Sequence, residues 1–510
     1  MPGSPNNQPL SADAVTHPDA PRRAGLWLLL AAAVYTAILV TPWHEDSKVR
    51  AAAALAAGTL VLWISEAAPL GATGLLIPAV ACASGLLNWR DAVAKWGDPI
   101  IMLFLGAFLL ARALEKHGAF DRLGDYVHRT ARTRGDALLV LVLMLGAGAL
   151  SAVQNNTAVT AMLLPVVIPI ARGAVRPAIP LLALAYGASY GGMATPVGTA
   201  PNFIGFAALR DVDPNASFLS WMRVGVPVWL GATAIGCFAL WVSRKITAEP
   251  AASDALASVA GAASAVEPPR APAPGQTVFQ AASAAGSART GRQPLAARAA
   301  LIALGLTAAA WLTVGAIHSI YPEGHAARVW CNRYVPESVP PVIAAVALFF
   351  VRVGRPQRAV LERRDINTLD FDTLFLVAGG LCLGQVLESS GAAAELAGLI
   401  GGRQMPLLLL YLTVSAVTVL MSEIVSNTAT AAMMVPIVRA LAVSQGVEPG
   451  PLIMLVALSA SLGVSLPIST PPNAIVYGSG LMRMRHMIVP GVIADVLGIA
   501  WVVMCVRMLA

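Results

Sequence analysis

The sequence predicts an all-α protein that crosses a membrane many times and whose two halves repeat each other in opposite orientation. Of its 510 residues, 57% are hydrophobic and 12% are charged, whereas about a quarter of the positions in a soluble protein are charged. Apolar blocks recur along the whole chain, basic residues gather between them, and one polar pattern occurs twice. These observations exclude an ordinary soluble enzyme, because the bilayer takes the place of a single large core.

Charge and cysteine content exclude other classes of protein. The formal net charge is +7, but the basic residues lie in small groups between apolar blocks, which is typical of cytoplasmic loops of membrane proteins. We therefore expect no nucleic-acid partner. The five cysteines show no CxxC or CxxH spacing, so neither a disulfide framework nor a zinc site is predicted. Residues 1–23 lack the pattern of a signal peptide and are expected to form a disordered cytoplasmic N-terminus.

The loop charges predict the direction of the first spans. One span follows Arg22–Arg23, and others lie near 51–66, 69–87 and 100–113. The last leads into the basic segment 112–134, which the positive-inside rule places in the cytoplasm. The stretch that follows has a polar break and basic residues on both sides, so we interpret it as a re-entrant hairpin over residues 137–170.

The second half follows a long polar segment. Spans near 178–209 and 221–243 precede residues 248–297, whose Ala, Ser, Gly and Pro content predicts a disordered cytoplasmic linker. Further spans lie near 299–319 and 338–351, with a basic loop after them. We therefore expect a cytoplasmic N-terminus, an outside C-terminus and four parts: 1–23, the N-terminal segment; 24–247, the first span and first repeat; 248–297, the linker; 298–510, the second repeat.

The repeat is visible as matches at one fixed offset along the chain. SAVQNNTAVTAMLLP at 151–165 answers SEIVSNTATAAMMVP at 422–436, and TPVGTAPN at 195–202 answers LPISTPPN at 466–473 with the same offset. The positions of the basic loops predict that the span at Leu103 runs toward the cytoplasm and that its counterpart at Leu374 runs toward the outside. The two copies are therefore inverted. An inverted repeat with polar, Pro-interrupted segments indicates a secondary transporter whose site lies between the copies at mid-membrane.

The polar breaks carry groups suited to anions and cations. Asn156-Thr157 and Asn427-Thr428 stand where helices begin, and a helix start presents free N–H groups and a positive dipole end to an anion. The side-chain oxygens suited to Na⁺ are those of Ser151, Asn155, Ser422 and Ser469. The alternative is that these residues hydrogen-bond between helices. No Lys or Arg falls within the interrupted segments, so we expect a bound dianion to depend on cations.

Two acids and one serine motif need separate interpretation. Glu423 and Asp495 lie within predicted membrane segments, where acids are functional candidates. Glu423 is a candidate for proton coupling or cation attraction, the alternative being a structural acid. Gly187-Ala188-Ser189-Tyr190-Gly191 matches the G-x-S-x-G pattern of hydrolases. However, the seven histidines lie in tails, loops or span ends, so an intramembrane hydrolase is a distant alternative and we expect no catalytic residues.

The paired motifs, NNT (155–157) with SNT (426–428) and GTAPN (198–202) with STPPN (469–473), resemble those of the divalent anion:sodium symporter (DASS) family. The resemblance covers about residues 50–510 except the linker. It implies a homodimer of chains with about eleven transmembrane helices and two re-entrant hairpins, divided into a scaffold domain and an elevator-type transport domain. It also implies di- or tricarboxylate or sulfate substrates, co-transported Na⁺ and no organic cofactor.

Position by position, the resemblance also implies binding residues. A first Na⁺ would lie near Ser151, Asn155, Asn156 and Gly198, and a second near Ser422, Val425 (by its carbonyl), Asn427 and Ser469. The substrate carboxylates would meet Asn155, Asn156, Thr157, Ser426, Asn427 and Thr428, with Thr199, Thr470 and Pro471 closing the site. Asn155 departs from the family pattern, in which the first motif usually begins with Ser.

The sequence thus predicts a Na⁺-coupled symporter of C4-dicarboxylates such as succinate or malate. It would work in the bacterial inner membrane by an elevator-like alternating-access mechanism. The nearest alternative is a sodium-independent exchanger of dicarboxylates or of another divalent anion, such as sulfate, tartrate or citrate.

Overall fold

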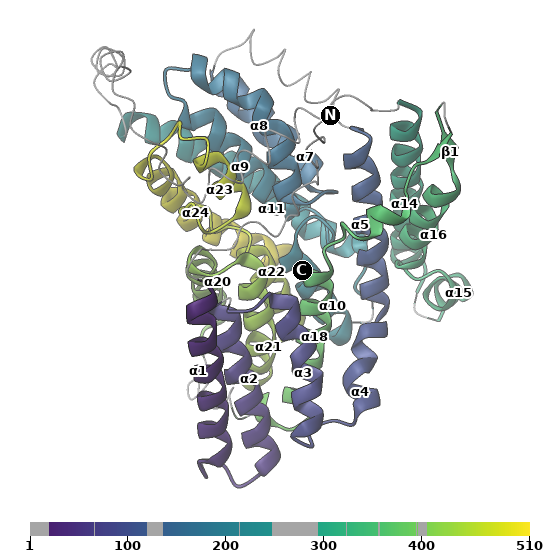
Figure 1. The fold of residues 1–510 in the computed structure, drawn as a ribbon, viewed down its shortest axis with the longest axis vertical. Coiled ribbons are helices and arrows are strands. Elements are labelled where there is room, and N and C mark those ends of the chain that lie inside the picture. The colour runs from purple at the N-terminus through teal and green to yellow at the C-terminus, as the bar shows by residue number, and fades with distance from the viewer. Residues whose placement is uncertain are drawn as a thin grey trace, which may run out of the picture.

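The protein is almost entirely helical (Figure 1). The structure, a computed structural model, describes residues 20–65, 67–119, 136–213, 215–246, 294–322, 324–354, 357–393, 395 and 405–510. Among these residues, nine helices are long and apolar enough to cross a membrane, and five shorter apolar helices accompany them. The predicted all-α, multi-pass class is confirmed.

The first half is a series of helices with one short 3₁₀ turn. Its elements are α1 (Ala20–Val40), α2 (Ser47–Ser65), α3 (Leu70–Ala83), α4 (Trp89–Ala94), the turn η2 (Lys95–Gly97), α5 (Pro99–Lys116), α7 (Asp136–Ser151), α8 (Asn156–Gly173), α9 (Ala178–Gly192), α10 (Ala200–Val212) and α11 (Phe218–Ile246). The expected hairpin corresponds to α7 and α8. The expected span 178–209 is two helices, α9 and α10, separated by a break.

The second half repeats this order. It contains α14 (Pro294–Ile320), α15 (Ala326–Tyr334), α16 (Val339–Phe350), a small antiparallel pair β1 (Arg352–Val353) and β2 (Arg358–Ala359), α17 (Arg363–Ile366), α18 (Phe371–Ser389), α20 (Leu407–Ile424), α21 (Asn427–Gln445), α22 (Pro449–Ser459), α23 (Pro471–Tyr477) and α24 (Arg485–Leu509). The expected linker 248–297 lies outside the described residues up to 293, and α14 includes the rest of it. Residues 1–19 of the expected N-terminal segment and 120–134 of the basic segment also lie outside them.

Two helices of the first half each pack against the counterpart of the other in the second half. Helix α3 packs against α18, and α16 packs against α5, although α3 corresponds to α16 and α5 to α18. The approach is close, because a Cβ atom on Gly74 would overlap the carbonyl oxygen of Phe375, and one on Gly106 would lie 2.7 Å from the carbonyl carbon of Pro341. The two copies therefore interlock rather than sit side by side.

The hairpins also pack against helices of the opposite half. Helix α8 of the first hairpin packs against α23 of the second half, and α21 of the second hairpin packs against α10 of the first half. Helices α11 and α24 pack together, with the Trp501 indole N–H donating to the Pro227 carbonyl at 3.2 Å. Each hairpin therefore meets the helix that follows the other half's break, which brings the four interrupted segments into one region.

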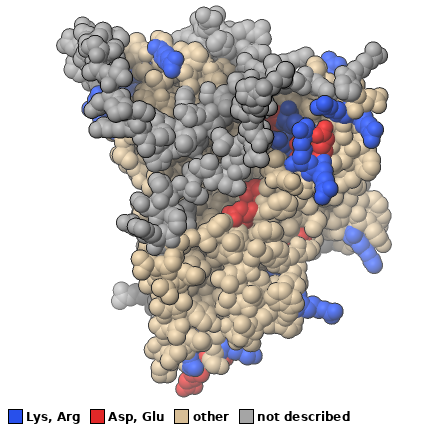
Figure 2. Space-filling view, viewed as in Figure 1, with Lys and Arg blue, Asp and Glu red and all other residues tan. Residues whose placement is uncertain are grey.

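Charged groups hold the basic loop after α16 to the end of α5. Lys116 Nζ lies 2.6 Å from Asp365 Oδ2, and Arg112 Nε lies 3.5 Å from Asp365 Oδ1. Elsewhere the face drawn in Figure 2 is mostly uncharged: charged side chains gather toward its upper right and its lower end, with a few basic ones at the upper left and a few acidic ones near the centre. This distribution fits a surface that mostly faces lipid.

Candidate substrate and cation site

Each hairpin turns at a capped helix start. Helix α7 ends at Ser151 and α8 begins at Asn156, with Asn155 Oδ1 accepting the Thr157 N–H at 2.8 Å. In the second hairpin, Ser426 Oγ accepts the Ala429 N–H at 3.3 Å at the start of α21. The capping residues are thus one position earlier than Asn156 and Asn427. In both hairpins a helix N-terminus with free N–H groups lies at the tip.

A buried serine contacts an asparagine inside each hairpin. Ser151 Oγ lies 2.5 Å from the Asn156 amide, and Ser422 Oγ lies 2.6 Å from Asn427 Oδ1. Both serines are fully buried. With its nitrogen facing acceptors, the Asn156 amide also donates to the Gly198 carbonyl at 3.2 Å. Three of the four residues expected at the first Na⁺ site are therefore in contact.

Two asparagines fill the breaks between helices. Asn202 Nδ2 donates to the Gly192 and Thr195 carbonyls at 2.9 and 2.8 Å. The corresponding Asn473 Nδ2 donates to two carbonyls of its own break, those of Val464 at 2.9 Å and Leu466 at 3.0 Å. Backbone that leaves a helix inside a membrane needs such partners. The sequence showed both residues as matches but gave them no separate role.

Hairpin and break form one cluster of oxygens in each half. Ser422 Oγ lies 2.6 Å from the Ala460 carbonyl oxygen, and in the first half Thr195 Oγ1 donates to the Ala152 carbonyl. A Cβ atom on Gly192 would lie 2.6 Å from the end of the Asn156 side-chain amide. The absence of a side chain at Gly192 is therefore what allows the hairpin tip to approach the break.

The second half adds a carboxylate that the first half lacks. Glu423 accepts hydrogen bonds from the Ser465 N–H at 2.7 Å, the Leu466 N–H at 3.0 Å and the Ser469 hydroxyl at 2.8 Å. The residue at the corresponding position of the first hairpin is Ala152. Glu423 therefore lies directly behind Ser469, one of the residues expected at the second Na⁺ site, and brings a carboxyl group to that half of the site.

The other expected site residues lie around these clusters. Thr157 and Thr428 are half-buried in the first turns of α8 and α21, and Val425 is buried at the end of α20. Thr470 is buried and caps α23 by accepting the Asn473 N–H at 3.2 Å. Thr199 is half-buried before α10.

Two expected residues are exposed, and one buried residue was missed. Asn155 and Pro471 are exposed, and the Asn155 side chain is used in the cap of α8. Gln154, which precedes Asn155 in the chain, is buried, and its side-chain nitrogen has no partner among the residues that the structure describes. Its place inside the polar break was the signal that could have identified it.

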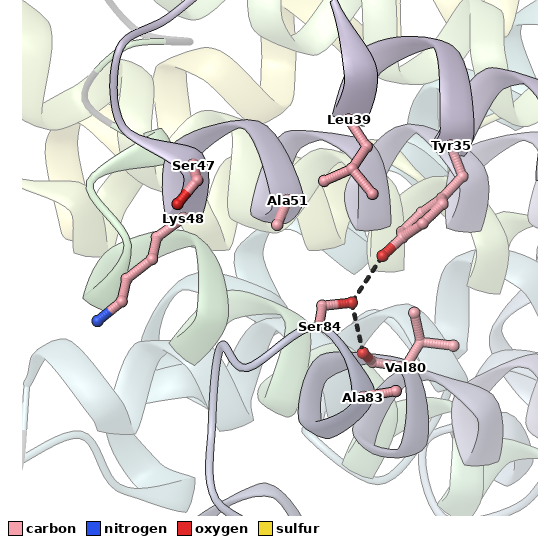
Figure 3. A pocket seen from close by; sticks show the side chains of 8 residues that line it. All are labelled: Tyr35, Leu39, Ser47, Lys48, Ala51, Val80, Ala83 and Ser84. Carbon is pink, nitrogen blue, oxygen red and sulfur yellow. Dashed lines mark hydrogen bonds between the residues drawn. The ribbon is translucent and has the colours of Figure 1, made fainter.

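A separate cavity lies between α1, α2 and α3 (Figure 3). Its volume is about 450 Å³, and the Tyr35 and Ser84 hydroxyls, 2.6 Å apart, face each other in it. None of the expected site residues lines it. The hairpin clusters, rather than this cavity, are the candidate site.

The serine of the hydrolase pattern has the wrong surroundings for a nucleophile. Ser189 is fully buried in the continuous helix α9, whereas a nucleophile elbow exposes its serine at a turn between strand and helix. This geometry does not suit Ser189 as a hydrolase nucleophile.

Comparisons with known proteins identify the family. The family model for citrate transporters (CitMHS) matches residues 60–447 and 402–509. The chain is 30% identical over 465 residues to an uncharacterized transporter of Haemophilus influenzae, covering 89% of this chain and 90% of that protein. It is 26% identical over 500 residues to the sodium-dependent dicarboxylate transporter SdcS of Staphylococcus saprophyticus, covering 93% and 89%.

A solved structure shares the fold. The antimetabolite efflux pump MtrF of Neisseria gonorrhoeae superposes with a TM-score of 0.53 at 11% identity, over 96% of this chain and 95% of that one. The matching family and the relatives are transporters and not enzymes. The chain therefore belongs to the citrate transporter (CitMHS) family of membrane transporters, in agreement with the resemblance of its paired motifs to the DASS family.

Proposed function

We propose that this protein is a Na⁺-coupled symporter that carries C4-dicarboxylates such as succinate or malate into the cell. The observation that carries the proposal is the duplicated contact between a buried serine and an asparagine, at Ser151–Asn156 and Ser422–Asn427. Uncharged hydroxyl, amide and carbonyl oxygens are hard ligands suited to Na⁺. The relative SdcS is described as sodium-dependent, which supports the same cation.

Two Na⁺ would occupy the two oxygen clusters. The first is assigned to Ser151, Asn155, Asn156 and Gly198, and the second to Ser422, Val425, Asn427 and Ser469. Glu423 would attract the second cation from behind, because its Oε2 lies 2.8 Å from Ser469 Oγ. Its three hydrogen-bond donors suit an ionised carboxylate.

The dianion would bind between the two hairpin tips. The N-termini of α8 and α21 offer N–H groups and positive dipole ends, and the side chains assigned to it are those of Asn155, Asn156, Thr157, Ser426, Asn427 and Thr428, with Thr199, Thr470 and Pro471 closing the site. No Lys or Arg occurs in these segments. Its two negative charges would be balanced by the bound cations, so its affinity should depend on Na⁺.

Transport would follow an elevator-like alternating-access cycle. The hairpins and the broken helices, α7–α11 and α20–α24, would form the moving transport domain, and α1–α5 with α14–α18 the scaffold. We propose a homodimer in the bacterial inner membrane, with the N-terminus in the cytoplasm and the C-terminus outside. Na⁺ would bind first and order the tips, after which the dianion binds and the transport domain moves.

Thermal unfolding of the purified protein tests this site. A ligand that binds only the folded state raises the unfolding temperature. We expect succinate or malate to stabilise the protein in NaCl and not in choline chloride, within a panel that includes tartrate, citrate and sulfate. Equal stabilisation in both salts would favour a sodium-independent exchanger.

A further inference from the structure

Two buried carboxyl groups in the second half are joined through one serine. The Ser465 N–H donates to Glu423 Oε1 at 2.7 Å, and the Ser465 hydroxyl donates to Asp495 Oδ2 at 2.5 Å. Glu423 lies near the end of α20 and Asp495 within α24, and they are 9% and 7% exposed. Burial of an acidic side chain inside a membrane segment costs free energy, and such residues usually have a function.

The two carboxyl groups are unequally supplied with hydrogen bonds. Glu423 accepts three. Asp495 accepts one of good geometry, from the Ser465 hydroxyl, and also faces the Val464 backbone and the Glu423 carboxyl group, while its oxygen Oδ1 is buried with no well-aligned donor among the described residues. An ionised carboxylate that lacks donors is costly to bury, and two neighbouring carboxylates resist simultaneous ionisation. Glu423 is therefore suited to carry the charge, and Asp495 to carry a proton.

The inverted repeat does not need this arrangement. At the offset that relates the two copies, Ala152, Ala194 and Val224 correspond to Glu423, Ser465 and Asp495. The first half thus builds its own hairpin, break and final helix with three apolar residues. Glu423, Ser465 and Asp495 are therefore particular to the second half, and the packing of the fold does not account for them.

The groups around Asp495 fit a proton site. Of the helices packed against α24, α20 supplies Glu423 and α9 supplies Tyr186 and Tyr190. The two tyrosine hydroxyls are fully buried and have no partner among the described residues. Helix α22 has no ionisable side chain. Among the described residues, Glu423 is the charged group that acts on Asp495. Arg223 and Cys237 of α11 do not act on it.

We propose that Asp495 is an exchangeable proton site and that Na⁺ binding at the second cation site expels its proton. This inference rests on the proposed function, because it takes Ser469 as a Na⁺ ligand. A cation there would offset the charge of Glu423, whose Oε2 lies 2.8 Å from Ser469 Oγ, and so reduce its repulsion of an ionised Asp495. The Asp495 O–H bond breaks, its electron pair stays on the carboxylate, and the proton passes to water as one Na⁺ enters.

The proposal has a reciprocal consequence. If Na⁺ displaces a proton, protons must weaken Na⁺ binding by the same factor. Since one proton is displaced, the apparent Na⁺ affinity rises by at most about tenfold per pH unit. Dicarboxylate uptake would then need more Na⁺ in acidic medium.

The test measures proton release directly. Purified protein in weakly buffered detergent solution is titrated with NaCl or choline chloride in the presence of a pH-indicator dye, and Na⁺ binding is followed in parallel by thermal unfolding. We expect NaCl alone to release protons, approaching one per chain. Asp495→Asn should abolish the release and the pH dependence of Na⁺ affinity while Na⁺ still stabilises the protein. Ser415→Ala is the control, because it removes a buried 2.7 Å hydroxyl pair with Ser459 between α20 and α22 and should leave the release unchanged.

The outcomes separate this inference from the proposed function. Stabilisation by Na⁺ without proton release overturns the proton site and leaves the symport proposal intact, whereas no stabilisation by Na⁺ overturns both. Ser465→Ala provides a second variant should Asp495→Asn fail to fold. It removes the hydroxyl that favours ionised Asp495 and keeps the N–H to Glu423, so proton release should shift to higher pH. Release with an unchanged pH dependence in Ser465→Ala would contradict the assignment to Asp495.

Discussion

Asn202 and Asn473 each donate two hydrogen bonds to backbone carbonyls of their own half of the protein, and one of the two, to Thr195 and to Leu466, is at corresponding positions. Each side-chain NH₂ group bridges two backbone carbonyls of the break that precedes its own helix, at 2.8 to 3.0 Å. Both residues are fully buried. A helix that stops inside a bilayer frees carbonyls that no water reaches, and in each half one amide takes the place of the missing backbone donors.

Removal of either amide should destabilise the protein. In Asn202→Ala or Asn473→Ala, two buried carbonyls lose their partner, at a cost of about 1–3 kcal/mol for each unsatisfied group. We expect a lower unfolding temperature in detergent for both variants. Asn367→Ala, at an exposed position after α17, is the control. Variants at 202 and 473 that unfold at the same temperature as the control would contradict this role.

Loss of the hairpin asparagines should impair transport more than folding. Asn156→Ala and Asn427→Ala each remove an amide that contacts a buried serine and a proposed Na⁺ ligand. The loss of one ligand worth about 1.4 kcal/mol lowers affinity about tenfold, so we expect at least that reduction in uptake at low Na⁺. Both variants should still insert in the membrane, as measured by surface labelling and size-exclusion chromatography. Wild-type uptake by both would refute the site.

A single methyl group at Gly192 should close the first cation site. In Gly192→Ala the Cβ atom would lie 2.6 Å from the end of the Asn156 side-chain amide and 3.1 Å from the Gly198 carbonyl oxygen, so the hairpin tip must move away. We expect Na⁺ to lose most of its stabilising effect on the purified variant. Gly305→Ala is the matched control, because a Cβ atom there would have nothing within 4 Å. A Na⁺ response equal in the two variants would argue against a cation at this place.

The sequence predicted the parts of this fold that depend on repetition and on apolar length. The constant offset between the copies identified both hairpins and both breaks, and α9 and α10 separate where Thr195-Pro196 interrupts the apolar run. The short helices α4, α15 and α17 were not predicted, because they are too short or too polar to resemble spans.

Contacts between distant segments could not be predicted from the pattern. Ser465 joins Glu423 of one helix to Asp495 of another, and no spacing along the chain encodes this. The sequence alone gives no role to Asn202 and Asn473, because a polar residue that holds the backbone and one that holds a cation recur at the same offset. Their hydrogen bonds distinguish the two roles.

The stability of the protein should depend on pH through Glu337, in the loop before α16. Burial raises the pKa of this carboxyl from 4.5 to about 6, although the Phe218 N–H and Arg210 oppose the shift. A raised pKa in the folded state stabilises the protein below about pH 4.5, and this contribution is lost as the pH rises through 6. Glu337→Gln, which stays neutral, should therefore gain about 2 kcal/mol relative to the wild type between pH 4.5 and pH 7.5.

Chemical or thermal unfolding at several pH values checks this effect. Glu115→Gln is the control, because the Glu115 side chain is 51% exposed. Its replacement should change the free energy of unfolding by the same amount at each pH value. Parallel stability curves for the wild type and Glu337→Gln across this pH range would show that Glu337 does not titrate as described.

Uptake of labelled succinate into proteoliposomes that contain no internal anion tests the central claim most directly. With an inward Na⁺ gradient, the account predicts saturable uptake well above that in choline, together with its loss in Asn156→Ala and Asn427→Ala. Uptake that is independent of Na⁺ and occurs only when the vesicles are preloaded with a dicarboxylate would contradict symport and identify the protein as an exchanger.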